Sequence, residues 1–243
     1  MSFDPTGFRA AIDAASPGLE PVAWLLQAAR EAPEPGRILL SQAASSLVTR
    51  GWLPSLDSLI DLAAEHGGVA AAEIHASVPA LAGLGLIVVD DGKVLEFAGT
   101  FTTRAGTLRY EIAEGGNVHL IGPIAALAVP RGLGRPGRIV GVCAGGGGDA
   151  FRLDCDETGI HTRSPETVAM FLPRWDGAMA PGAAISAGAL FADDDALSDW
   201  QEQSGDPDGM PLASFMFPMA TNDLGPQLGA ALESLLDRLA NFA

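Results

Sequence analysis

The sequence has few cysteines and no long apolar run, and each shortage excludes a class of protein. Cys143 and Cys155 are its two cysteines, too few for a disulfide framework. No basic segment followed by an apolar one opens the chain as a secretory signal would, so we expect a cytoplasmic protein. The apolar runs fall short of the roughly 20 residues that a membrane-spanning helix needs, which predicts no membrane partner.

Basic residues are also scarce. Fourteen Lys and Arg stand against thirty Asp and Glu, for a formal net charge of −16. The negative electrostatic field of such a chain repels phosphate backbones, so we predict no nucleic-acid partner.

Aromatic residues supply 6% of the chain while apolar residues supply 48%. This composition favours closely packed helices with small side chains over a large aromatic cleft.

Proline and glycine breaks divide the 243 residues into three predicted parts. Residues 1–66 form a helical N-terminal extension, with helices at 8–15 and 22–31 and apolar residues at helical spacing up to Ala63. These Ala- and Leu-rich helices offer a surface for a homodimer. Residues 67–115 then follow as a second module.

The second module reads as helix, helix and hairpin, a winged-helix-like pattern. The helices are predicted at 69–73 and 75–85, and the hairpin joins residues 87–89 to 94–97 through an Asp-Gly turn. Winged helices that read DNA carry basic residues on the second helix. Residues 77–86 contain none, which favours a structural role.

Residues 116–243 are predicted to form a small mixed β-sheet with packed helices. Residues 118–143 read as an apolar helix, a Gly/Pro/Arg turn and a strand. Further on, a helix at 193–203 capped by Asp193 or Asp194, a strand at 212–217 and an amphipathic helix at 224–242 are expected. The fold class predicted for the whole chain is therefore α+β.

Several local motifs carry a family resemblance. They are Val129-Pro130, Leu133-Gly134-Arg135, Arg138-Ile139-Val140 leading into Cys143, Leu190-Phe191-Ala192 before Asp199-Trp200, and an approximate match over 217–228. From about Gly67 onward, the chain resembles the organomercurial (alkylmercury) lyase family. The resemblance implies a winged-helix-like module joined to a small mixed sheet. Its enzymes cut carbon–mercury bonds with two cysteine thiolates and a nearby aspartate.

The family's reactive positions fall on inert residues here. Carried over by position, the first catalytic cysteine falls on Gly122, the aspartate on Ala125, and the second cysteine near Ile185 with Ser186 beside it. Cys143 matches a family cysteine that is regarded as structural. Because Gly, Ala and Ile offer neither a thiolate nor an acid, we predict that the protein is not an organomercurial lyase.

The same replacements predict a small, mostly apolar pocket lined by Gly122, Ala125, Ile185 and Ser186, suited to a small organic molecule. His119, taken as one turn before Gly122, is the candidate catalytic residue. The leading hypothesis is a diverged small-molecule enzyme, possessing no cofactor and no metal. The alternative is a non-catalytic small-molecule-binding or scaffold protein.

Two other groups offer metal or phosphate chemistry. Cys143 and Cys155, expected close together on paired strands, make a zinc set with His119 and His161 conceivable, but buried structural cysteines are favoured. The glycine run 145–148 is followed by a strand-like segment, so a hairpin turn is favoured over a phosphate loop.

Two clusters of charged residues leave alternatives open. Arg131, Arg135 and Arg138 either clamp a ligand anion or pair with acids at the surface. Asp154, Asp156 and Glu157, around Cys155, and His161 either perform acid–base work beside the pocket or belong to an exposed turn.

Overall fold

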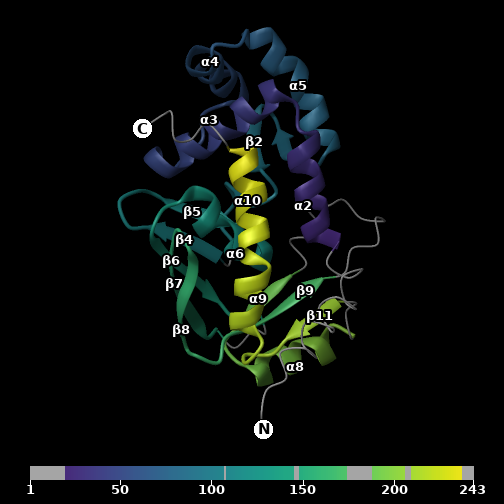
Figure 1. Ribbon diagram of the computed structural model, residues 1–243, viewed down its shortest axis with the longest axis vertical. Helices are drawn as coiled ribbons and strands as arrows, with labels where there is room; N and C mark the ends of the chain where they lie inside the picture. The colour runs from purple at the N-terminus through teal and green to yellow at the C-terminus, as the bar shows by residue number, and fades with distance from the viewer. Residues whose placement is uncertain (1–19, 107, 145–147, 174–187, 206–208, 237–243) are drawn as a thin grey trace.

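The protein is described from a computed structural model, over residues 20–106, 108–144, 148–173, 188–205 and 209–236. The helix predicted at 8–15 lies outside these ranges. Figure 1 shows α10 along the middle of the molecule with α2 beside it and the large sheet to one side. Helices α3 to α5 lie at one end, and a small sheet with α8 lies at the other. The α+β class is confirmed.

Four helices precede the first strand: α2 (Glu20–Glu31), α3 (Glu34–Arg50), α4 (Leu56–Gly67) and α5 (Ala71–Gly83). Gly51 ends α3 in the left-handed conformation (φ 74°), where its N–H donates to the Leu47 carbonyl, the usual glycine stop. Ser55 begins α4 by accepting the Ser58 N–H at 3.3 Å. Most of α3 is buried and α2 packs on α10, so their apolar faces are used within the chain.

The two helices predicted at 69–73 and 75–85 are one helix, α5, and that prediction of a break is wrong. Residues 71–77 contain neither Gly nor Pro, so nothing interrupts the helical hydrogen bonds before Pro79. Helices α4 and α5 and the β1–β2 hairpin do follow one another in the chain. Its designation as a winged helix remains a prediction.

Eight strands form the large sheet in the order β1-β2-β3-β5-β4-β6-β7-β8. Their bounds are β1 (Ile87–Asp90), β2 (Lys93–Phe97), β3 (Phe101–Thr102), β4 (Leu108–Ile112), β5 (Asn117–Leu120), β6 (Gly137–Val142), β7 (Ala150–Asp156) and β8 (Gly159–Ser164). Every strand pair in the described ranges is antiparallel. The prediction of a mixed sheet is therefore wrong, because even the neighbours that are not consecutive in the chain, β3 with β5 and β4 with β6, run in opposite directions.

The predicted β1–β2 hairpin is confirmed. Asp91 and Gly92 both have positive φ, 46° and 70°, as a two-residue type I′ turn requires. Downstream, β4 pairs with both β5 and β6. The boundary predicted between residues 115 and 116 thus falls inside one continuous sheet.

The helix predicted to begin near Val118 begins instead at Gly122, because residues 117–120 form β5. Val118 and Leu120 are buried while Asn117 and His119 point the other way, the two-residue period of a strand. Hydrogen bonding to β3 and β4 on its two sides holds β5 extended. A helix at these residues would leave the β5-facing edges of β3 and β4 without hydrogen-bond partners.

Cross-strand register separates the sheet into two faces. The inner face is defined by a row of directly paired residues: Phe97, Phe101, Leu120, Leu108, Gly141 and Phe151. The outer face is defined by the adjacent row: Glu96, Thr102, His119, Arg109, Val140 and Arg152. The inner row is apolar and the outer row is mostly polar.

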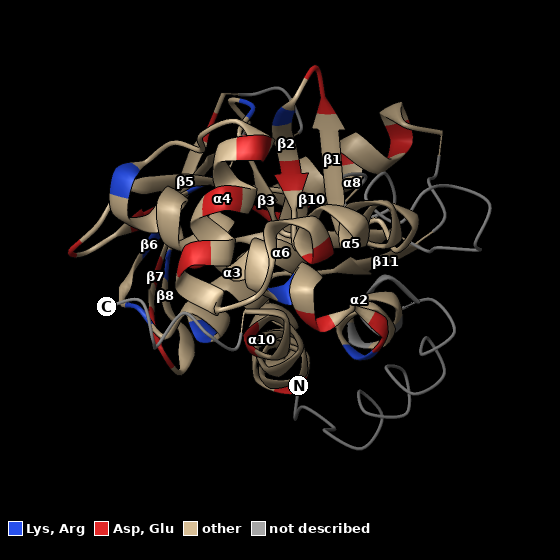
Figure 2. Cartoon of the chain, turned by 90° about the horizontal axis from the view of Figure 1, so that it is seen from above, with Lys and Arg blue, Asp and Glu red and all other residues tan. Residues whose placement is uncertain are grey.

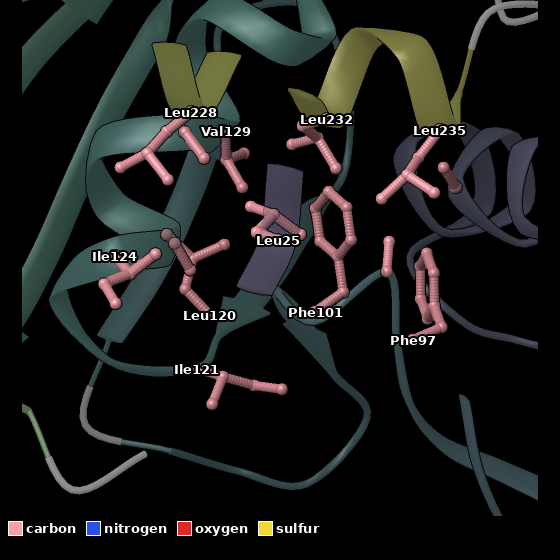
Figure 3. Packing of buried hydrophobic residues seen from close by; sticks show 14 of the residues in the cluster. Leu25, Phe97, Phe101, Leu120, Ile121, Ile124, Val129, Leu228, Leu232 and Leu235 are labelled. Carbon is pink, nitrogen blue, oxygen red and sulfur yellow. The ribbon is translucent and has the colours of Figure 1, made fainter. Parts of the chain in front are cut away.

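Helices α6 (Gly122–Leu133) and α10 (Gly225–Leu235) cover the inner face. Residues 123–130 of α6 are all buried, which explains why this helix is apolar all round. Leu232 of α10 and Phe101 of β3 approach one another with Leu25 of α2 beside them (Figure 3). The two helices meet at glycines, since a Cβ on Gly132 would lie 2.7 Å from Leu232 Cδ2.

A second sheet has the order β10-β9-β11. Its strands are β9 (Ala169–Pro173), β10 (Ala189–Phe191) and β11 (Gly209–Leu212). The same part of the chain contains the helices α8 (Asp194–Gln203) and α9 (Phe217–Asp223). Of the two predicted caps, Asp193 is the one that caps α8, because it accepts the Ala196 N–H at 2.8 Å. The strand predicted at 212–217 is wrong, because β11 ends at Leu212 and Phe217 begins α9.

The closing helix is described from Gly225 to Leu235, and the rest of its predicted length lies outside the described ranges. Within those ranges, every helix is too short or too polar to cross a lipid bilayer. Acidic segments are scattered over the helices and turns, and basic segments are few (Figure 2). The negative charge is therefore distributed over the described fold.

Candidate functional site

A pocket of about 450 Å³ lies on the outer face of the sheet, where the α3–α4 connection covers β2, β3 and β5. We call it the His119 pocket. Apolar side chains form much of its wall: Leu47, Trp52, Leu53, Pro54, Val94 and Leu95. Its polar side chains are Ser55, Lys93, Thr102, Thr103, Asn117 and His119. Both the volume and the mixture of many apolar and a few polar groups are typical of small-molecule sites.

Strand geometry places the polar residues. His119 and Asn117 alternate with the buried Val118 and Leu120 on β5, so both face the pocket. Thr102 lies directly opposite His119 on β3. The pocket floor is therefore a rigid, paired part of the sheet, while its roof is the irregular segment between two helices.

His119 keeps hydrogen-bonding capacity for a ligand. Its Nδ1 accepts a long hydrogen bond, 3.5 Å, from the Gly106 N–H, and this assignment leaves a proton on Nε2. In the described part of the chain, no carboxylate hydrogen-bonds to the His119 ring. The arrangement supplies a donor to a bound molecule and lacks the orienting acid of a typical catalytic histidine.

Trp52 supplies an aromatic surface at the mouth. Its side chain is 56% exposed, although large aromatic residues are usually well buried. Trp52 directly follows Gly51, whose left-handed backbone ends α3 and turns the chain over the pocket. An exposed indole in this position can stack on a flat ligand.

The other predicted pocket residues lie elsewhere. Gly122 is the first residue of α6 and Ala125 is fully buried in the core between the sheet and α10. His119 precedes the helix on a strand and points away from that core, so the structure does not bring it together with Ala125. Ile185 and Ser186 lie outside the described residues.

The two cysteines lie at opposite ends of the β6–β7 hairpin, and the expectation that they lie close together is wrong. Cys155 pairs with Gly137 at one end, whereas the Cys143 N–H donates to the Asp149 carbonyl at the other. Six residues of strand separate these ends, roughly 20 Å. Both thiols are buried, and burial raises the pKa of Cys155 to about 12.

No group of three or more His, Cys, Asp or Glu side chains is placed to hold a metal ion in the ranges that the structure covers. The hairpin predicted around the glycine run is confirmed, because β6 and β7 pair on its two sides. A phosphate loop would need a helix after the glycines, and the chain continues as a strand.

The predicted arginine cluster separates in the fold. Arg138 pairs with Glu111 on the outer face, together with Arg109, and the Arg138 hydrogen bond lowers the pKa of Glu111. Arg131 instead packs between α10 and the β7–β8 turn, where a Cβ on Gly159 would lie 2.9 Å from its Nε. The three guanidinium groups therefore do not converge on one ligand site.

Asp156 and His161 form an exposed ion pair of 2.6 Å across the β7–β8 turn. This pair and the hydrogen bonds from Thr158 lower the pKa of Asp156 to about 2. Neither residue lines the His119 pocket. The exposed-turn alternative is the one that the structure supports.

Sequence reasoning missed most of the pocket. Trp52, Lys93 and Asn117 come from three separate parts of the chain, and only the folded sheet and the α3–α4 connection bring them together. One sequence signal was present: Lys93 is the sole lysine of the chain.

Comparison with known proteins gives a fold relationship. No protein-family model and no curated protein matches the sequence. Among solved structures, a crystal structure of the mercury-bound form of MerB2 aligns with a TM-score of 0.68 and 16% identity, covering 88% of this chain and 99% of that one. This likeness supports an alkylmercury-lyase-like fold. The aligned share exceeds what residues 67–243 supply, so the similarity extends into residues 1–66.

Proposed function

We propose that this protein binds a small organic molecule with an apolar body in the His119 pocket. The observation that carries the proposal is the pocket itself, about 450 Å³ between a paired sheet and an aromatic roof. Its walls would exclude water from most of a small ligand, while Asn117 and His119 would orient its polar groups. Binding is favoured over catalysis because no carboxylate among the described residues orients the His119 ring.

We also propose that the protein does not cleave carbon–mercury bonds, despite its fold. A two-thiolate reaction requires both sulfurs on one mercury atom, and the chain has two cysteines, both buried and at opposite ends of a hairpin. Hydrocarbon release from an organomercurial should not exceed that of a Cys143→Ala/Cys155→Ala double variant. Release above that control would contradict the proposal.

The binding proposal can be tested by NMR with a library of small organic fragments. The chain has four histidines, of which His119 lines the pocket and His161 lies on β8, at the far edge of the sheet from β1. We expect saturable binding that shifts the ring signals of His119 and the indole signal of Trp52 while those of His161 stay in place.

A pocket-filling variant, Asn117→Trp, provides the control for this experiment. Asn117 is exposed on β5, so the larger side chain occupies the pocket without displacing the core. It should abolish the shift at His119. If every fragment leaves His119 and Trp52 unmoved, or if the variant binds as well as the wild type, the proposed site is wrong.

A further inference from the structure

We infer that the His119 pocket selects an organic carboxylate, a monoanion with a flat apolar body, and that Lys93 is its counter-ion. This inference rests on the proposed function and adds the chemical class of the ligand. Lys93 is the chain's single lysine, and its side chain lines the pocket from the first position of β2.

The turn of the β1–β2 hairpin holds the backbone of Lys93 in place. Asp91 and Gly92 form the type I′ turn of the β1–β2 hairpin, and the Gly92 carbonyl accepts the Leu56 N–H at 2.9 Å. This hydrogen bond ties the hairpin to the first residue of α4. The lysine backbone is thus fixed relative to the α3–α4 connection that forms the pocket roof.

The charge of Lys93 is uncompensated within the pocket. No Asp or Glu lines it, and none within the described residues makes an ion pair with Lys93. Two acids lie near Lys93. Glu96 pairs with Arg104 at 3.8 Å. Asp90, the last residue of β1, lies directly opposite Lys93 across the hairpin, is exposed and does not line the pocket. In a protein of net charge −16, a pocket whose one permanent charge is positive favours an anion.

The other residues that line the pocket indicate the chemistry of the rest of the ligand. Asn117 and His119 offer N–H donors on the sheet, and Trp52, Leu53 and Pro54 offer an apolar roof. A carboxylate satisfies one lysine and neighbouring neutral donors, whereas a phosphate dianion is usually held by arginine forks or several backbone N–H groups. An aromatic or aliphatic monocarboxylate therefore fits this pocket best.

A matched pair of probes tests the inference: benzoate, and its neutral analogue benzamide. Dissociation constants are measured by the NMR shifts of His119 in the wild type, Lys93→Met and Arg152→Met. Lys93→Met removes the charge and keeps most of the stem. Arg152→Met removes a charge that pairs with Asp154 on the outer face, away from the pocket.

We expect Lys93→Met to weaken benzoate about five-fold, the effect of an ion pair in a partly exposed site, and to leave benzamide unchanged. Arg152→Met should change neither. Benzoate should also protect Lys93 from amine acylation, read by peptide mass at this single lysine, and the protection should fall with added salt.

The possible failures are distinguishable. Equal affinity for both probes, or benzoate binding that Lys93→Met does not alter, would overturn the carboxylate inference and leave the pocket standing. Binding of other fragments without either probe would do the same. A pocket that takes no fragment at all would overturn the proposed function together with this inference.

Discussion

The two faces of the large sheet differ in what their residues contribute. On the inner face, Phe97 and Phe101 stack with ring centroids 4.8 Å apart, and α6 and α10 exclude solvent (Figure 3). On the outer face, Arg109, Glu111 and Arg138 make ion pairs in partly exposed positions. Stability comes chiefly from the buried face, which leaves the outer face available for a pocket with polar groups.

Shortening a buried side chain of the inner face should have the largest effect on the free energy of unfolding. Leu232 is fully buried between α10 and the sheet, so Leu232→Ala is expected to lower the free energy of unfolding by about 2–5 kcal/mol. Urea unfolding measures it. The adjacent Glu233 is exposed, and Glu233→Ala should stay within about 0.5 kcal/mol of the wild type. Equal losses would mean that α10 is not anchored by its buried face.

Adding a methyl group where α6 contacts α10 should have a smaller effect on the free energy of unfolding. A Cβ at position 132 would meet Leu232 Cβ at 2.8 Å, an atom that cannot move without its helix. We expect Gly132→Ala to cost about 1–3 kcal/mol by thermal or urea unfolding. Gly83 in α5 has open space for a Cβ, so Gly83→Ala should be neutral or stabilise by up to about 1 kcal/mol. If both variants gain stability, α6 and α10 do not touch at Gly132.

The smallest effect on stability is expected for a substitution at an exposed ion pair, and this effect depends on pH. Because the folded-state pKa of Asp156 is lowered from 3.8 to about 2, its contribution to stability is present above pH 4 and lost as the pH falls toward 2. Asp156→Asn should therefore be slightly less stable than the wild type at pH 5, and the difference should disappear near pH 2. Urea unfolding across this range measures it.

The neighbouring Glu157 provides the control for the pH experiment. It is exposed in the same turn and makes no ion pair in the part of the chain that the structure describes. Glu157→Gln should not reproduce the pH-dependent difference. A difference between Asp156→Asn and the wild type that persisted unchanged at pH 2 would show that the ion pair with His161 is not its source.

Local sequence patterns were sufficient where a single segment decides its own structure. The Asp-Gly turn of the β1–β2 hairpin and an aspartate cap of α8, at Asp193 or Asp194, could both be predicted, because each depends on backbone conformations or hydrogen bonds among residues close in sequence. Family motifs added the alkylmercury-lyase-like fold, which the MerB2 structure supports.

The sequence alone failed where the partner lies far along the chain. Residues 117–120 looked like the start of an apolar helix, yet pairing with β3 and β4 makes them a strand and turns His119 toward the outer face. The cysteines looked like neighbours, yet the register of β6 and β7 places them at opposite ends. Register is a property of two strands, so neither sequence segment contains it by itself.

By itself, then, the sequence determined the α+β class, the acidic charge and the local turns and caps, since these follow from composition and from residues in direct succession. The tertiary structure alone decided which side chains share a site. Trp52, Lys93 and His119 meet because the α3–α4 connection folds over strands that are up to 67 positions away in sequence, and that contact is set by the packing of the whole sheet against its helices.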